Sequence, residues 1–106
     1  MEKYELAELE QRRAANGALY LEFLRVSDLN CGLYVLPAGM PDPQQPHDED
    51  EVYYVIDGRG RFTAEGRDEE VGPGTVLYVA KHVEHRFHDI TADLTILVFF
   101  ASAARG

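Results

Sequence analysis

Cysteine and basic residues are scarce in this sequence, and each scarcity excludes a class of protein. Cys31 is the only cysteine among 106 residues, so an intrachain disulfide framework is excluded and a reducing compartment is expected. Lys and Arg total 10 against 19 Asp and Glu, which gives a formal net charge of −9. Because this charge repels phosphate backbones and anionic membrane surfaces, we expect neither nucleic acid nor a membrane as a partner.

Long apolar runs and several common catalytic motifs are also missing. No segment has the length and hydropathy of a transmembrane helix, and the N-terminus lacks a signal-peptide pattern. The sequence contains no Ser-His-Asp nucleophile elbow, no phosphate-binding glycine loop and no Cys-x-x-Cys pair. We therefore expect a soluble, cytoplasmic protein of one ordinary domain with a single modest core.

The first part of the chain predicts a short helix. Residues 2–13 are strong helix formers, with Leu6 and Leu9 on one side and Gly17 where the helix can end. The apolar side of this helix is too small to form a core, so we expect it to pack as an accessory against a sheet or a partner subunit. The expected division is a helical extension over residues 1–17 and a β domain over residues 18–106.

The rest of the chain predicts strands. Aromatic and branched residues fill 19–26 and 31–36, and a further strand begins near residue 51. Proline and glycine make residues 37–46 a stiff loop. More strands are predicted at 61–65, 69–71, 75–79, 84–88 and 94–100, with turns at 58–60, 66–68, 72–74 and 91–93. Regular short strands separated by turns predict an all-β barrel or sandwich.

A polar loop and the strand after it carry the first candidate ligands for a metal. Side chains alternate faces along a strand, so Gln45, His47, Glu51 and Tyr53 are expected to point the same way. The acidic residues 48–50 are expected to form a solvated turn. The opposite face of the strand is expected to point outward.

A second segment adds another histidine. His85 and Phe87 are expected to share the inner face of their strand, with His88 on the outer face. With His47 and His85 both inside, two imidazoles and the Glu51 carboxylate meet in the barrel. Mononuclear Fe(II) sites use this set of ligands, and Mn, Ni, Co or Zn also accept it. The remaining coordination positions stay open for water or substrate.

The stiff loop offers a fourth ligand. Gln45 can reach the metal with its amide oxygen, which is neutral and weaker than an imidazole nitrogen. Asp42 and Gln44 lie in the same loop and are alternatives to it. An oxygen donor at this position makes the metal a stronger Lewis acid that is bound less tightly.

The spacing of these residues resembles the first motif of the cupin family, in which His-x-His is followed by three or four residues, Glu, six residues and Gly. Here His47, three residues, Glu51, six residues and Gly58 match that motif, and Gln45 stands where the family has its first His. The family's second motif is represented by residues 73–75 and, further on, by a second histidine. The resemblance spans roughly residues 33–100.

The resemblance implies an all-β, double-stranded β-helix barrel of the cupin or jelly-roll type, with the short helix preceding it. It also implies a metal inside the barrel, as one divalent ion of Fe, Zn, Mn or Ni. The implied ligands are Gln45, His47, Glu51 and His85.

The resemblance further implies a metal-dependent enzyme acting on a small organic molecule, since cupins include dioxygenases, isomerases and lyases. Tyr53 is then a candidate proton donor or orienting group, and Tyr53, Phe62 and Phe87 are candidates to line the pocket. The alternative is a non-catalytic module that binds a small molecule, with the metal absent or structural. We also expect a homodimer through the face of Tyr54 and Ile56, because so small a barrel buries more surface by pairing.

Overall fold

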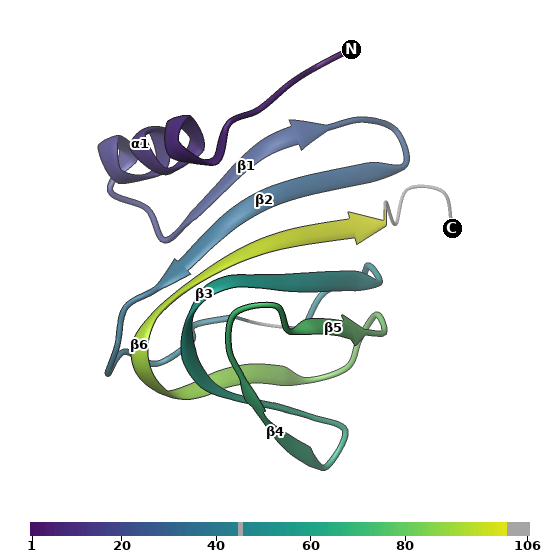
Figure 1. The fold of residues 1–106 in the computed structure, drawn as a ribbon. Helices are drawn as coiled ribbons and strands as arrows, with labels where there is room; N and C mark the ends of the chain where they lie inside the picture. The colour runs from purple at the N-terminus through teal and green to yellow at the C-terminus, as the bar shows by residue number, and fades with distance from the viewer. Residues whose placement is uncertain (45, 102–106) are drawn as a thin grey trace.

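The computed structural model describes residues 1–44 and 46–101, which form one helix and six strands (Figure 1). The elements are α1 (Leu6–Asn16), β1 (Tyr20–Arg25), β2 (Leu29–Leu36), β3 (Glu51–Ala64), β4 (Arg67–Val71), β5 (Val76–Val79) and β6 (His85–Ala101). The predicted all-β architecture with a short N-terminal helix is confirmed. In the described part of the chain, no helix is long and apolar enough to cross a membrane.

The strands form one strongly curved antiparallel sheet. Its order is β1-β2-β6-β3-β4, and β5 pairs with the first part of β3 outside this path. The last strand, β6, therefore lies between β2 and β3, as Figure 1 shows. Among the described residues, the path ends at β1 and β4 and does not close. This curvature makes an interior face that can hold a core and a site.

β3 and β6 are longer than predicted because two predicted turns are wrong. The sequence predicts turns at 58–60 and 91–93, whereas the structure places these residues inside β3 and β6. The register shifts three times between Val55 and Arg61, and such bulges bend a strand without ending it. Gly58 has a φ of 96°, and a Cβ there would lie 2.1 Å from the Asp93 carbonyl oxygen. The bend therefore requires glycine at this position.

The helix packs against the outside of the sheet. α1 begins at Leu6, later than predicted, and ends at Asn16 with Gly17 as its left-handed cap. It contacts β1 and β2 (Figure 1). Leu9 is its buried residue, and the Tyr4 ring before it packs edge-on against Phe23 of β1 with ring centroids 4.9 Å apart. The helix covers one end of the outer face and leaves the site free.

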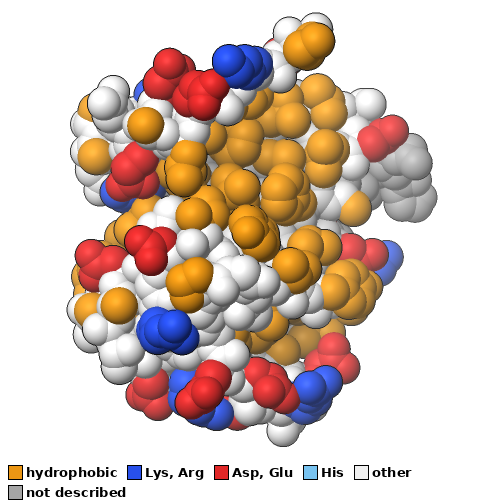
Figure 2. Space-filling model, in the orientation of Figure 1, with side chains coloured by type: hydrophobic (Ala, Val, Ile, Leu, Met, Phe, Trp, Pro, Cys, Tyr) orange, Lys and Arg blue, Asp and Glu red, His pale blue; other side chains and the backbone are white. Residues whose placement is uncertain are grey.

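Alternation along β3 and β6 separates a core face from an outer face. Tyr53 and Val55 of β3 are fully buried, as are Leu94 and Ile96 of β6. The outer face keeps apolar side chains near the surface, and Tyr54 is 41% exposed. In the same orientation as Figure 1, Figure 2 shows hydrophobic side chains gathered over β1, β2, β6 and β3. The predicted assignment of Tyr53 to the inside and Tyr54 to the outside is confirmed.

Candidate metal centre

His47, Glu51 and His85 converge on one point inside the curved sheet. Each offers a ligand atom, and these atoms all lie within 4.8 Å of one another. His47 comes from the loop before β3, Glu51 is the first residue of β3, and His85 is the first residue of β6. The side chains of Glu51 and His85 are each 1% exposed, with Oε1 and Nε2 2.9 Å apart. Two imidazoles and one carboxylate thus share a protected volume.

Curvature of the β3–β6 ladder produces this meeting. Along the ladder, Glu51 pairs with Phe100 and His85 pairs with Ala64, so the two ligands stand at opposite ends of the paired segment. A flat ladder would hold them many residues apart, because each residue advances a strand by about 3.3 Å. The bulges around Gly58 bend both strands and bring the ends together. The geometry of the site therefore depends on the bend.

His85 is oriented by its own backbone neighbourhood. Its Nδ1 lies 2.8 Å from the Val83 carbonyl oxygen, which can only accept, so Nδ1 carries the proton. Nε2 is then directed at Glu51, as in metal sites whose ligating histidine donates its other N–H to a carbonyl. Burial lowers the pKa of His85, but its hydrogen bonds to Glu51 and Val83 outweigh burial, and the pKa is raised overall. The site thus favours a positive charge beside Glu51.

Glu51 supplies the test of whether a metal fits. Its Oε2 is buried and has no hydrogen-bond partner among the described residues. A buried carboxylate oxygen without a partner is costly, and native structures satisfy such atoms with donors, ions or water. A cation bound by Glu51, His47 and His85 would satisfy this oxygen and would be coordinated by one nitrogen from each imidazole. The residues present therefore fit a divalent metal.

Tyr53 stands at the centre of the polar group with its side chain fully buried. Its hydroxyl donates to Gln44 Oε1 at 2.7 Å and lies 2.9 Å from His85 Nε2. Burial, followed by the nearby Glu51 charge, raises the pKa of Tyr53 far above its ordinary value. The hydroxyl therefore stays protonated, and Tyr53 acts as a donor at this position.

Phe62 and Phe87 form an aromatic layer behind Tyr53. Their ring centroids lie 4.6 Å apart, and Tyr53 packs edge-on against both at 5.7 and 5.2 Å. Phe62 also lies 5.9 Å from the His85 ring. Both phenylalanines are buried in the core. They fix the ring of Tyr53 from behind, and their role in lining a pocket stays a prediction.

The loop before β3 brings Gln44 to the centre. Gln44 Oε1 accepts from Tyr53 and lies 3.5 Å from His47 Nε2, while Gln44 Nε2 donates to Asp42 Oδ2 at 2.7 Å. Asp42 thereby turns the amide so that its oxygen faces the site. Gln45 lies outside the described residues, and its predicted role as a ligand stays a prediction.

Asp42 anchors the loop, a role that the sequence did not reveal. Its carboxylate is buried and accepts four hydrogen bonds, from Tyr34 Oη, the Gln44 and Phe87 backbone N–H groups and the Gln44 amide. These contacts tie the loop to β2 and β6. An acidic residue between two prolines was the only available signal, and such residues are usually solvated.

His82 and His88 both lie outside the centre, and the predicted outer position of His88 is confirmed. His82 is exposed, and its backbone N–H donates to the His47 carbonyl at 2.7 Å, which fixes the loop that carries His47. His88 lies on the outer face, with Nε2 2.6 Å from Asp68 Oδ1. Hydrogen bonds from Arg61, Thr63 and His88 hold the pKa of Asp68 well below its usual range. This outer cluster braces β3, β4 and β6.

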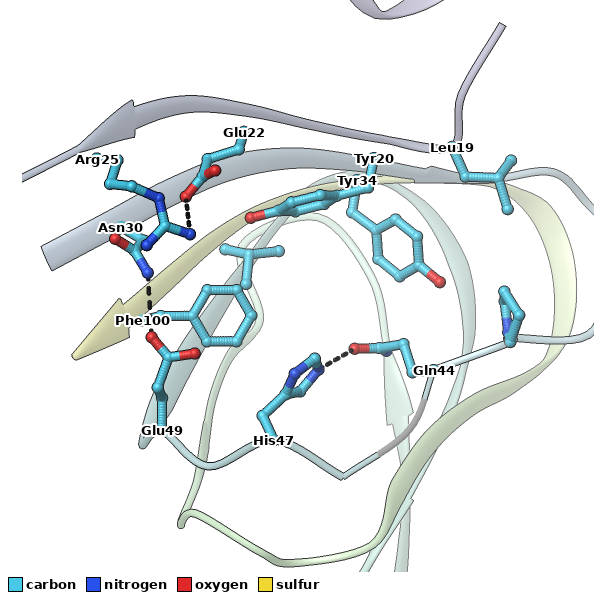
Figure 3. Close-up of a pocket in the computed structure, with 12 residues that line it drawn as sticks. Leu19, Tyr20, Glu22, Arg25, Asn30, Tyr34, Gln44, His47, Glu49 and Phe100 are labelled. Atoms are coloured by element: carbon cyan, nitrogen blue, oxygen red, sulfur yellow. Dashed lines mark hydrogen bonds and ion pairs between the residues drawn. The ribbon is translucent and has the colours of Figure 1, made fainter. Parts of the chain in front are cut away.

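A cavity of about 380 Å³ opens beside the centre (Figure 3). His47 and Gln44 line one side, and residues of β1, β2 and β6 line the other. Tyr20 and Phe100 give it aromatic walls. Most of its lining was not predicted as part of a site, because it comes from strands without ligand motifs. The cavity gives a small molecule access to the side of His47.

Comparison with known families and proteins identifies relatives of the chain. The model of the cupin domain matches residues 32–100. The Streptomyces coelicolor protein SCO3923 is 46% identical over 101 residues, which cover 95% of this chain and 96% of that protein.

Solved structures show the same fold at low sequence identity. KdgF from a Halomonas species has a TM-score of 0.70 at 19% identity and covers 77% of each chain. The DMSP lyase DddQ from Ruegeria pomeroyi has a TM-score of 0.68 at 23% identity over 73% of this chain and 40% of the lyase. Salicylate 1,2-dioxygenase from Pseudoaminobacter salicylatoxidans has a TM-score of 0.80 at 13% identity over 95% of this chain and 33% of the dioxygenase. The chain thus spans less than half the length of the DMSP lyase and of the dioxygenase. The predicted double-stranded β-helix fold is confirmed.

Proposed function

Because this chain belongs to the cupin family, we propose that it is a metal-dependent enzyme that acts on a small organic molecule held beside His47. The observation that carries the proposal is the cluster of His47, Glu51 and His85, in which one buried carboxylate oxygen has no hydrogen-bond partner in the described part of the chain. Fe, Zn, Mn or Ni suits two imidazoles and a carboxylate. The enzymes among the structural neighbours make a lyase or dioxygenase reaction a reasonable class to test first.

Within this proposal, the chain's own residues have separate tasks. When bound, a divalent ion supplies Lewis acidity toward an oxygen of the substrate. Tyr53 keeps a proton on its hydroxyl and donates it to Gln44 Oε1, which holds the amide oxygen beside the centre. Gln44 contributes a neutral amide oxygen next to His47. The aromatic walls of the cavity exclude water from the side of the substrate away from the centre.

We propose Gln44, through its amide oxygen, as the fourth ligand in preference to Gln45. Gln44→Ala should weaken metal affinity by at least about tenfold, because a direct ligand contributes no less than the groups that only support ligands. Gln45→Ala is the matched control, and calorimetric titration of each metal-free variant with Mn²⁺, Ni²⁺ or Zn²⁺ separates the two. A larger loss in Gln45→Ala than in Gln44→Ala would show that the proposed donor is wrong.

A second candidate is a binding module without turnover. It is favoured by the position of Tyr53, because its fully buried hydroxyl already donates its proton to Gln44 and is therefore poorly placed to act as a general acid or base. Mass spectrometry of the metal-loaded protein incubated with a bacterial metabolite extract distinguishes the enzyme from the binding module. Depletion of a compound by the wild type but not by Glu51→Gln supports the enzyme. Ligand-dependent thermal stabilisation without depletion of any compound supports the binding module.

A further inference from the structure

The cavity beside His47 has two ends of different chemistry. At one end, His47 and Gln44 connect it to the candidate metal centre. Its middle is lined by apolar and aromatic groups, among them Tyr34 and Phe100. At the other end, side chains of Glu22, Arg25, Asn30 and Glu49 come together, as the left side of Figure 3 shows. A volume of about 380 Å³ is near the lower limit of ligand pockets, roughly 300–1,000 Å³, so the occupant must be small.

The polar end has more acceptors than donors. Asn30 donates its amide to Glu49 Oε2 at 3.0 Å, and this contact fixes which way the amide faces. Asn30 Oδ1 is then buried without a hydrogen-bond partner among the described residues. Glu22 pairs with Arg25 at 2.8 Å, and no ion pair within residues 1–44 and 46–101 compensates the negative charge of the Glu49 carboxylate. A ligand group that donates hydrogen bonds or carries positive charge suits this end, and an anionic group does not.

Tyr20 extends the aromatic wall toward the polar end. Its ring lies across β2 over Gly32, where an added Cβ would fall 2.0 Å from the Tyr20 hydroxyl oxygen. Glycine at this position therefore lets the ring lie flat along the cavity. The Tyr20 hydroxyl points toward Glu22 and Asn30 in Figure 3. Tyr34 packs edge-on against the same ring with centroids 5.9 Å apart, so the wall is rigid.

We propose that the cavity binds a small molecule with a flat apolar or aromatic body and a hydrogen-bond-donating or cationic group at the end away from His47. The opposite end of this molecule carries the oxygen donor that faces the metal centre, so this part of the inference rests on the proposed function. Selectivity for charge resides in Glu49, and selectivity for shape resides in Tyr20 and the residues around it.

Two matched series of compounds test this inference. The first consists of benzohydroxamic acid and its para-aminomethyl and para-carboxy derivatives, whose hydroxamate chelates metals. The second consists of the corresponding benzamides, which lack the chelating group. Affinities are measured by calorimetry on the metal-loaded protein, on Glu49→Gln and on Glu70→Gln. Glu70 is the control, since its side chain is 87% exposed on β4 and its substitution changes the net charge equally.

The inference predicts the same order in both series. The aminomethyl compound should bind about fivefold to tenfold more tightly than the unsubstituted one, and the carboxy compound more weakly by a similar factor, as expected for one charge near a carboxylate in a partly screened site. Glu49→Gln should remove this order, and Glu70→Gln should keep it. The inference is overturned if the carboxy compounds bind best, if the order survives in Glu49→Gln, or if no compound binds.

The two series also separate this inference from the proposed function. The metal centre predicts that each hydroxamate binds more tightly than its benzamide, and that a chelator abolishes the difference. If each hydroxamate binds only as tightly as its benzamide while the aminomethyl compounds still bind best and the carboxy compounds worst, the metal role is refuted and the cavity assignment is supported. If the hydroxamates bind more tightly than the benzamides but the charged substituents make no difference, the metal role is supported and the cavity assignment is refuted.

Discussion

Asp42→Asn provides a direct test of how the loop before β3 is held. The substitution keeps the shape of the side chain but replaces one carboxylate oxygen with an NH₂ group. Either orientation of the new amide sets that NH₂ group against two of the four donors that now face Asp42, from Tyr34, Gln44 and Phe87. Hydrogen bonds to charged groups contribute about 1.5–3 kcal/mol each, so we expect the free energy of unfolding to fall by roughly 3–5 kcal/mol.

Urea unfolding of the metal-free protein, followed by circular dichroism, measures this loss. Tyr34→Phe is the control, because it removes only one of the four donors and should cost about 1–2 kcal/mol. The double variant should cost less than the sum of the single variants, since the hydroxyl and the carboxylate are partners. A loss below about 1 kcal/mol in Asp42→Asn would refute the assignment of Asp42 as the anchor.

Three further substitutions test the bend, the outer cluster and the outer face. In thermal unfolding, Gly58→Ala should destabilise the protein by more than about 3 kcal/mol, and it should abolish metal binding. Gly39→Ala is the control, because Gly39 also has a positive φ but lies in open space, and it should cost only about 1 kcal/mol. Similar effects of the two substitutions would refute the role of the bend. Hydrogen bonds from Arg61, Thr63 and His88 keep the pKa of Asp68 low, so the Asp68 carboxylate stabilises the protein above about pH 4 and this stabilisation is lost as the pH falls further. In urea titrations, the free energy of unfolding of Asp68→Asn should therefore differ from that of the wild type only at the higher pH. We propose that a second copy of the chain covers the outer face, where Tyr78 is 66% exposed. Light scattering should find a dimer, and Tyr78→Lys should convert it to a monomer. A monomeric wild type would contradict this proposal.

The parts of the fold that follow a simple period could be predicted from the sequence. Alternation along a strand correctly placed Tyr53 inside and Tyr54 outside, and it separated His85 from His88. The period of two residues is a property of the extended backbone, so it holds wherever the strand is regular. Residues 46–50 lie outside any strand, so the alternation by which the sequence favoured Gln45 over Gln44 does not hold there.

The bends and the cavity could not be predicted, for different physical reasons. Glycines at 58 and 60 indicate a turn as readily as a bulge, and only the pairing of Arg59 with Ala92 shows that the strands continue. The cavity wall depends on Tyr20 lying over Gly32, a contact between strands that leaves no mark in either segment. Asp42 was hidden for the same reason, because its donors come from three separate parts of the chain.

Elemental analysis of protein purified without a metal-chelating tag tests the central claim most directly. The account predicts one divalent transition metal ion per chain, bound by His47, Glu51 and His85. Glu51→Gln, which keeps the size of the side chain and removes its charge, should lose most of this metal while remaining folded. A wild-type chain that carries no metal and takes none up when Fe²⁺, Mn²⁺, Ni²⁺ or Zn²⁺ is added would contradict the account.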